Sequence, residues 1–462
     1  MISHACPVVV LDDQKTELWH VSHGLASCGL PVMSHLVTDG KLDWAPAEPY
    51  SGIRLLISDL HLLGPTQAKP EQYVSALIGF IKTLVRPSSY LIVFWSNYAD
   101  EASDAWALLK QRLKTELQPV AFRVIPKELA KNAADDDEDV AGPAREELRK
   151  AIAGILGEFP QLQALMDWEA SVSQAAAETT NELLRILPKG KASIDDPAHV
   201  RAVLARMAQE ALGYPYAPQA PAKGLTQALM PILQDFLERN EAPSQTRLQT
   251  FLNIQDENQV ALPHADLKPL LNDFFIHSED DGSGPLDRGA VVRFDTGYLE
   301  QGLLQDVGLM DEAGDWREAV CREFYSGWKT DKDKEAGKQA KQALQAENVY
   351  AVELSAVCDH AQNKQRTQRF LFALFVPSAV GNTPFFHIKK GTVAHDAIYV
   401  TPEITLNAVS GRLLISCRVF LAKPYKSAVA GTCVTRLRKD VVDELAHHYA
   451  THMRRPGKIA FF

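Results

Sequence analysis

The sequence lacks the features that mark membrane and exported proteins. No apolar run approaches the length of a membrane-spanning helix, and the start MISHACPVVV has no charged region followed by a cleavage site, as a signal peptide would. Six cysteines, at positions 6, 28, 321, 358, 417 and 433, show no paired spacing, which favours reduced thiols over a disulfide framework. These absences predict a cytoplasmic protein that does not enter the membrane.

The sequence also has no excess of basic over acidic residues. The chain has 58 Asp and Glu against 48 Lys and Arg, a formal net charge of −10. Broad nucleic-acid binding draws its affinity from phosphate neutralisation by Lys and Arg, so the sequence argues against it. The best candidate for a local basic patch is the tail, with Arg436, Arg438, Lys439, Arg454, Arg455 and Lys458. Cations near a helix end more often interact favourably with the helix dipole.

A chain of 462 residues is too long for one hydrophobic core and should hold two or three domains. Two acidic stretches mark the boundaries, at residues 132–143 and 278–285. Both combine like charges with Gly and Pro, so we interpret them as exposed linkers. The predicted domains are therefore residues 1–131, 144–277 and 286–462.

The first of these domains alternates apolar runs with amphipathic segments. Apolar runs typical of buried strands occupy residues 7–11, 31–37, 53–58, 90–95 and 121–125, and apolar residues recur at helical spacing in residues 16–30, 69–85 and 103–117. Strands that alternate with helices of this length indicate βαβ units and a parallel sheet. We therefore predict a doubly wound α/β domain.

A polar residue follows each of four predicted strands: Asp12 and Asp13 after the first, then Asp59, Ser96 and Lys127. Ligands of open parallel sheets bind at the carboxyl ends of the strands, so we expect these side chains in one pocket. Clustered carboxylates suit Mg2+, and a carboxylate is able to accept a phosphoryl group.

We assign Asp12, Asp13 and Asp59 to the metal, and Asp59 also to phosphoryl acceptance. Ser96 and Lys127 would hold the phosphoryl oxygens, because phosphoryl transfer depends on positioning and on neutralising charge. For any one of these residues taken alone, a helix cap or a solvated loop is the alternative.

Over residues 5–131 this pattern resembles the receiver domain of bacterial two-component response regulators. The resemblance rests on the acidic pair in VVVLDDQ, the acceptor Asp in LLISDLHL, the hydroxyl residue in LIVFWSN and the Lys in FRVIPKEL. It implies a flavodoxin-like fold, Mg2+ dependence and phosphorylation of Asp59 by a sensor histidine kinase. Pro126 precedes Lys127 instead of following it, and Trp95-Ser96-Asn97 replaces the small residues usual there. A degenerate receiver that takes no phosphate is the alternative within this family.

The remaining two predicted domains differ in their pattern of secondary structure. Residues 144–277 are predicted to form a helical connector, and residues 286–462 an α+β domain of extended runs closed by a long helix at 434–453. Cys358 and His360, with His387 as a second possible base, are the candidates for a metal or thiol site there. They lack a CxxC or HxxxH pattern and a second ligand cluster, so docking or dimerisation is the preferred role of this domain.

The order of receiver, helical connector and further domain resembles large receiver-containing proteins of bacterial conflict systems, notably two-component antiphage defence of the Detocs type. That resemblance implies a regulator or phosphate buffer, with a sensor histidine kinase and a second response regulator as partners. Dimerisation through the C-terminal domain would make a second copy of the chain a further partner. The alternative is an effector enzyme that the receiver switches, with its active site near Cys358.

Overall fold

The computed structural model describes residues 7–63, 70–96, 99–135, 137–186, 197–239, 245–254, 262–264, 267–278, 284, 287–295, 297, 299–309, 314–324, 341–342, 344–356, 367–378, 397–424 and 431–453. The chain divides into two compact units. The first unit is Met1–Ile186 with Ile232–Asp256, and the second is Leu187–Pro231 with Glu257–Phe462. Among the described residues, no helix combines the length and the apolar character needed to cross a membrane.

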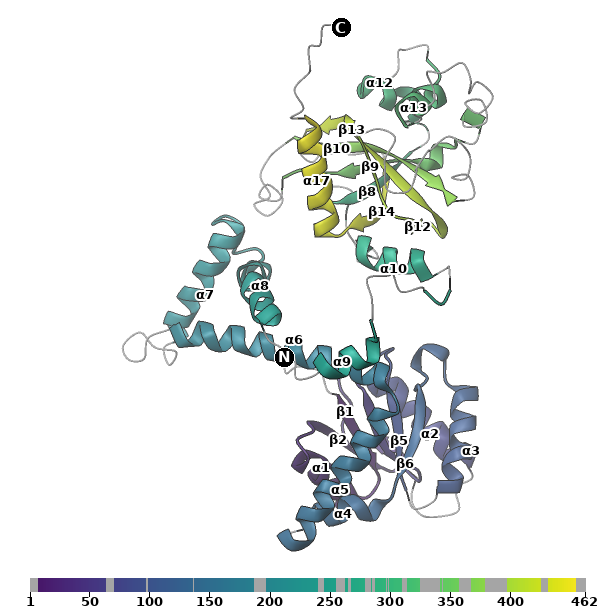
Figure 1. The fold of residues 1–462 in the computed structure, drawn as a ribbon, viewed down its shortest axis with the longest axis vertical. Helices are drawn as coiled ribbons and strands as arrows, with labels where there is room; N and C mark the ends of the chain where they lie inside the picture. The colour runs from purple at the N-terminus through teal and green to yellow at the C-terminus, as the bar shows by residue number, and fades with distance from the viewer. Residues whose placement is uncertain are drawn as a thin grey trace. The chain divides into compact units, whose positions relative to one another are not determined.

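The first unit is built on a six-stranded sheet of order β3-β2-β1-β4-β5-β6. Figure 1 labels β1, β2, β5 and β6 of this sheet. Its strands are β1 (Val8–Asp12), β2 (Val32–Thr38), β3 (Lys41–Leu42), β4 (Leu55–Asp59), β5 (Leu91–Trp95) and β6 (Ala121–Ile125). All neighbours pair in parallel except β3, which is antiparallel to β2. The parallel strands thus follow the 2-1-3-4-5 order of flavodoxin-like sheets, which is consistent with the predicted α/β class.

Helices cover both faces of this sheet. The helices α1 (Lys15–Ser27), α4 (Lys127–Ala133) and α5 (Glu138–Gly157) contribute to the core on one face, and α2 (Pro70–Leu84) and α3 (Ala99–Arg112) to the core on the other. Successive strand residues point to opposite faces, so a strand covered on both sides reads as a continuous apolar run. Val8, Val9, Val10 and Leu11 follow this rule, and each is at most 1% exposed.

The crossover from β2 to β4 departs from a regular βαβ unit. Residues 43–54 contain no helix and reach β4 through irregular chain. Pro46, Pro49 and Gly52 disfavour a helix in this segment. Tyr50 anchors the segment instead, because its hydroxyl lies 3.1 Å from Nε2 of the buried His35.

The stretch that we expected to be an exposed linker, 132–143, is helical over most of its described length. Helix α4 ends at Ala133, and α5 begins at Glu138 after Asp137 caps it by accepting a hydrogen bond from the Asp139 amide at 3.0 Å. Acidic residues at a helix start are favoured by its dipole, so the charge run begins a helix here. Ala133 and Ala141 are fully buried, which joins this segment to the core of the first unit.

The first unit also contains α6 (Pro160–Ile186) and α9 (Gln245–Leu252), and a short 3-10 helix, η1 (Thr115–Leu117). Helix α6 is tied to the sheet by Arg54, whose guanidinium donates to Glu169. The predicted helices of residues 144–186 are therefore present, with α5 part of the same core as the sheet.

The second unit contains a mostly antiparallel sheet of order β11-β13-β10-β9-β8-β14-β7, with β12 paired to β13. Its strands are β7 (His277–Ser278), β8 (Ala290–Phe294), β9 (Val349–Glu353), β10 (Gln368–Pro377), β11 (Ile398–Val400), β12 (Ile404–Leu406), β13 (Val409–Lys423) and β14 (Gly431–Leu437). This sheet agrees with the α+β character expected for the C-terminal part of the chain.

Helices lie on both faces of this sheet as well. Helix α10 (Leu267–Ile276) and the closing helix α17 (Lys439–Met453) contribute to one core, and η2 (Leu299–Leu303), α12 (Leu304–Asp306) and α13 (Trp316–Phe324) to the other. Helix α7 (Pro197–Leu212) precedes them, and α8 (Pro221–Arg239) is divided between the two units after Pro231. Helix α10, which we placed in the connector, is bonded to the sheet region through Asn272, whose amide donates to the Glu403 carbonyl at 2.7 Å.

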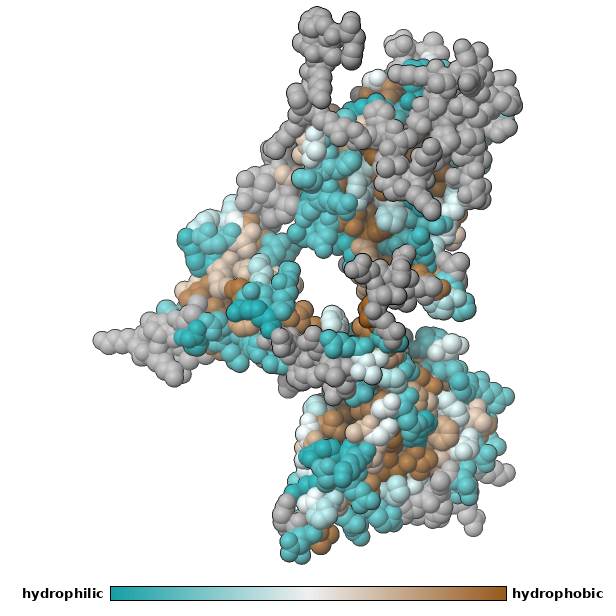
Figure 2. All heavy atoms as spheres, viewed as in Figure 1, coloured by the Kyte–Doolittle hydropathy of each residue, from teal (hydrophilic) through white to brown (hydrophobic). Residues whose placement is uncertain are grey.

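Apolar side chains are visible at the surface of both units (Figure 2). The most exposed of the second unit are on α10, where Phe274 and Phe275 are 64% and 67% exposed. Several apolar side chains of α10 are therefore exposed and are not covered by the described part of the second unit.

Candidate functional site

The topology of the first unit brings four strand ends to one edge of the sheet. Strands β1, β4, β5 and β6 are adjacent and parallel, so their carboxyl ends coincide. The register pairs Leu11 with Ser58, which makes Asp12 and Asp59 neighbours on β1 and β4. Ser96 and Lys127 follow the ends of β5 and β6. This edge is where open parallel sheets bind ligands.

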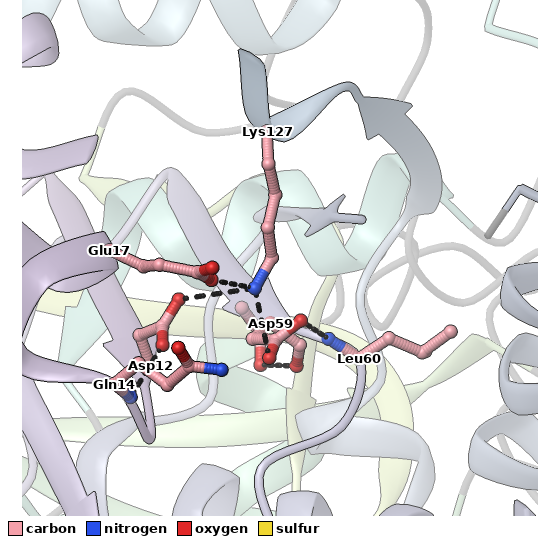
Figure 3. A network of polar contacts seen from close by, with 7 residues as sticks. Asp12, Gln14, Glu17, Asp59, Leu60 and Lys127 are labelled. Carbon is pink, nitrogen blue, oxygen red and sulfur yellow. Dashed lines mark hydrogen bonds and ion pairs between the residues drawn. The ribbon is translucent and has the colours of Figure 1, made fainter. Parts of the chain in front are cut away.

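Lys127 lies at the centre of the cluster (Figure 3). Its Nζ is 3.2 Å from Oδ2 of Asp59 and 3.7 Å from Oδ2 of Asp12, and it donates a hydrogen bond to Oε2 of Glu17. These residues come from the first turns of α4 and α1 and from the ends of β4 and β1. One ammonium therefore faces three carboxylates.

Backbone amides orient the two buried carboxylates. Asp12 and Asp59 are 1% and 5% exposed. Oδ1 of Asp59 accepts a hydrogen bond from the Leu60 amide at 2.7 Å, and Oδ1 of Asp12 accepts one from the Gln14 amide at 2.8 Å. Oδ2 of Asp12 accepts no hydrogen bond from the described residues, and its contact is the ammonium of Lys127. In both aspartates, Oδ1 is fixed by the backbone and Oδ2 points to Lys127.

The cluster carries more negative than positive charge. Burial raises the pKa of Asp12 to about 7; Lys127 opposes this shift, while the charges of Asp59 and Glu17 add to it. For Lys127, burial works to lower the pKa, but Asp59, Glu17 and Asp12 outweigh burial and raise it. Lys127 therefore stays protonated, and the excess negative charge of the cluster contributes to the raised pKa of Asp12.

The donor set fits a hard divalent cation. One oxygen each from Asp12, Glu17 and Asp59 lies within 4.8 Å of the others. Mg2+ and similar cations prefer carboxylate oxygens. A bound cation would offset the negative charge that Lys127 alone leaves uncompensated. In the described part of the chain, this is the one group of three or more metal-binding side chains. The chemistry of these donors points to a class of cation, not to one metal.

The structure brings together three of the five residues selected from the sequence, Asp12, Asp59 and Lys127. Asp13 is half-buried beside the cluster and is not among its three grouped carboxylates. Ser96 is 3% exposed at the same edge, and its amide donates to the Ile125 carbonyl at 3.2 Å. The assignments of Asp13 to the metal and of Ser96 to the phosphoryl oxygens stay predictions.

Sequence reasoning missed Glu17, the third carboxylate at Lys127. A signal was present, because Glu17 lies four residues after Asp13, in the first turn of the helix predicted to begin at Thr16. The amino end of that helix follows directly on the carboxyl end of β1, so its first turn belongs to the same edge of the sheet.

Neither a protein-family model nor a curated protein matches the chain. The interpretation of the site therefore depends on its geometry and chemistry.

The second candidate site, at Cys358, His360 and His387, lies outside the described residues. Two described cysteines of the second unit are buried, and burial raises the pKa of Cys321 to about 12 and that of Cys417 to about 11. Thiols of this kind are poor nucleophiles, since the thiolate is the reactive form. The effector-enzyme alternative thus depends on residues that the structure does not describe.

Proposed function

We propose that the protein is a cytoplasmic phosphoacceptor, in which a receiver-like first unit takes a phosphoryl group on Asp59 from a sensor histidine kinase. The observation that carries the proposal is the position of the Lys127 ammonium between Asp59 and Asp12 at the carboxyl edge of a parallel sheet. Phosphoryl transfer needs an accepting carboxylate, a cation near the phosphoryl oxygens and further carboxylate oxygens for a metal ion. The buried Asp59 carboxylate, the Lys127 ammonium and the neighbouring carboxylates match these needs.

In the proposed step, a carboxylate oxygen of Asp59 attacks the phosphorus of the phosphohistidine. The new O–P bond forms as the N–P bond of the donor breaks, and the electron pair of that bond leaves with the imidazole. The Leu60 amide keeps the Asp59 carboxylate oriented, and Lys127 draws in the phosphoryl oxygens. A bound Mg2+, held by Asp12, Asp13 and Asp59, would neutralise charge on those oxygens.

Ser96 is proposed to donate its hydroxyl to a phosphoryl oxygen. Its support is its place at the end of β5, one residue beyond Trp95, which the register pairs with Asp59. A hydroxyl at this position would add a donor next to the cations without adding charge.

The larger role proposed is that of a regulator or phosphate buffer in two-component antiphage defence. This part rests on the resemblance of the overall arrangement, with a first unit that holds the acidic cluster and a second unit with its own sheet. A second response regulator and a second copy of the chain are the other partners proposed.

Phosphorylation of the intact chain tests the proposal. Incubation with Mg2+ and acetyl phosphate should add one phosphoryl group by intact mass, and hydroxylamine should remove it, because an acyl phosphate is labile to that nucleophile. Asp59→Asn should lose the label, since the amide cannot accept the group. Asp104→Asn, a matched change at an exposed aspartate of α3, should label as the parent does. Equal labelling of the Asp59 variant and the parent, or no labelling of the parent, would contradict the proposal.

A further inference from the structure

Lys127 is engaged by more carboxylates than the proposed chemistry requires. An ammonium has three N–H donors. In this structure Nζ faces three carboxylates, those of Asp12, Glu17 and Asp59. A phosphoryl group on Asp59 would bring further oxygens that need the same donors. For Lys127 to hold that group, one of the present contacts has to be given up.

Glu17 is the contact that is released at the lowest cost. Asp59 carries the phosphoryl group, and Asp12 is fully buried on β1 and held by the Gln14 amide. Glu17 comes from the first turn of α1, and its side chain is 33% exposed. Its longer side chain is therefore able to turn toward water, where a carboxylate is well solvated.

We propose that Glu17 is a positioning residue that competes with the phosphoryl group for Lys127. The inference rests on the proposed function of Asp59. In the unmodified protein Glu17 holds the ammonium; in the phosphorylated protein Lys127 donates to a phosphoryl oxygen, and Glu17 turns to solvent. No covalent bond changes in this exchange. Its consequence is that Glu17 disfavours the phosphorylated state and sets how readily the site is occupied.

A different role for Glu17 makes the opposite prediction. Its carboxylate oxygen lies within 4.8 Å of those of Asp12 and Asp59, so a direct part in cation binding would be geometrically reasonable. A cation ligand supports occupancy of the site, whereas a competitor opposes it. The sign of the effect of removing the Glu17 charge therefore separates the two roles.

The test uses the full chain, with beryllofluoride as the phosphoryl mimic at a fixed Mg2+ concentration. Binding is followed by thermal shift. Glu17→Gln keeps the size of the side chain and removes its charge, so the half-saturating concentration of beryllofluoride should fall roughly two- to fivefold, the range expected for losing one partly exposed ion pair. Glu48→Gln is the matched control, because Glu48 also forms an ion pair, with Arg86. Glu48 precedes the amino end of β4 and Arg86 that of β5, whereas Lys127 follows the carboxyl end of β6. Glu48→Gln should leave that concentration unchanged.

A double mutant shows whether Glu17 acts through Lys127. In a Lys127→Met background, adding Glu17→Gln should no longer improve beryllofluoride binding. The Mg2+ titration without beryllofluoride should keep its midpoint in Glu17→Gln. If Glu17→Gln folds poorly, Glu17→Ala should show the same gain.

Three results would overturn the inference. Unchanged or weaker beryllofluoride binding in both Glu17 variants would remove the competitor role. A gain that persists without Lys127 would show a general charge effect, and a higher Mg2+ midpoint would assign Glu17 to the cation. Failure of the parent protein to bind beryllofluoride at all would instead contradict the proposed function, and with it this inference.

Discussion

The two units each contain an ionic cluster, and the clusters differ in how well their charges are satisfied. In the second unit, Glu323 of α13 accepts hydrogen bonds from Nε and Nη2 of Arg418 at 3.2 and 2.8 Å and from the Ser416 hydroxyl at 2.5 Å. The side chain of Glu323 is 7% exposed, so these bonds replace water. The cluster pairs one anion with one cation.

This second cluster supports an irregular part of the sheet. The register between β10 and β13 shifts between Leu371 and Ala373, opposite residues 416–419. The Ser416 hydroxyl accepts hydrogen bonds from the amides of Arg418 and Val419, each at 3.1 Å. Buried polar groups that are fully bonded hold a fold in one conformation. We therefore interpret the Glu323 cluster as structural.

The cluster of the first unit lacks this balance. Three carboxylates face one ammonium, and Oδ2 of Asp12 accepts no hydrogen bond from the described residues. Buried charge without a compensating partner lowers the stability of the fold in the absence of a ligand. Groups with strongly perturbed pKa values, such as Asp12, concentrate at functional sites. The two clusters therefore differ in charge balance: the first carries an excess of negative charge, and the second pairs one anion with one cation.

The largest effect should come from changing Asp12 to Asn and varying the pH without Mg2+. The pKa of Asp12 is raised from 3.8 to about 7 in the folded protein. The native state then binds the extra proton between these values, so the contribution of Asp12 to the unfolding free energy falls as the pH rises from about 4 to 7. The stability of Asp12→Asn relative to the parent should therefore rise by up to about 4 kcal/mol over that interval.

Chemical denaturation in EDTA at a series of pH values measures this difference. Glu323→Gln is the comparison, because a bonded carboxylate loses strong hydrogen bonds when it becomes an amide. It should destabilise the protein where Asp12→Asn stabilises it. A parent and an Asp12→Asn variant with parallel pH profiles would show that the first cluster is not short of positive charge.

A somewhat smaller effect should follow from removing the cation of the second cluster. Arg418→Met would leave the buried carboxylate of Glu323 without its charged partner, at a cost of about 2 to 3 kcal/mol. The loss should appear as faster hydrogen exchange in α13 and β13. Arg322→Met is the control, since Arg322 pairs with Glu318 on the exposed side of the same helix and should cost under about 0.5 kcal/mol. Equal costs for the two changes would contradict the structural role of the Glu323 cluster.

Much of the first cluster was predictable because its strands are simple. Strands β1, β4 and β5 are apolar runs buried on both faces, so their ends, and with them Asp12 and Asp59, are readable from the sequence. Lys127 follows from the end of β6, whose sequence is mostly apolar although the strand is only partly buried. Glu17 was harder to find, because an acidic residue in the first turn of a helix is common and carries no periodic signal.

Other features depended on tertiary structure. The acidic run at 132–143 reads locally as a linker, but Ala133 packs into the core that α1, α4 and α5 form on the first sheet, and Ala141 is buried as well. The run is therefore the junction of two helices. The Glu323 cluster joins residues of α13 and β13 that are more than ninety positions apart. Neither spacing nor composition brings those residues together, so only the folded chain reveals the contact.

The smallest effect should be stabilisation by Mg2+, which is confined to the first cluster. A ligand that binds only the folded state stabilises it by about 1.4 kcal/mol at ten times its dissociation constant. Mg2+ should thus raise the melting temperature of the parent, and both Asp12→Asn and Asp13→Ala should reduce that rise, whereas Asp104→Asn should not. Arg418→Met should keep the full Mg2+ response despite its lower stability, because its cluster is already balanced. A response to Mg2+ that is equal in the parent and in Asp12→Asn would place the cation elsewhere and remove the main chemical difference between the two clusters.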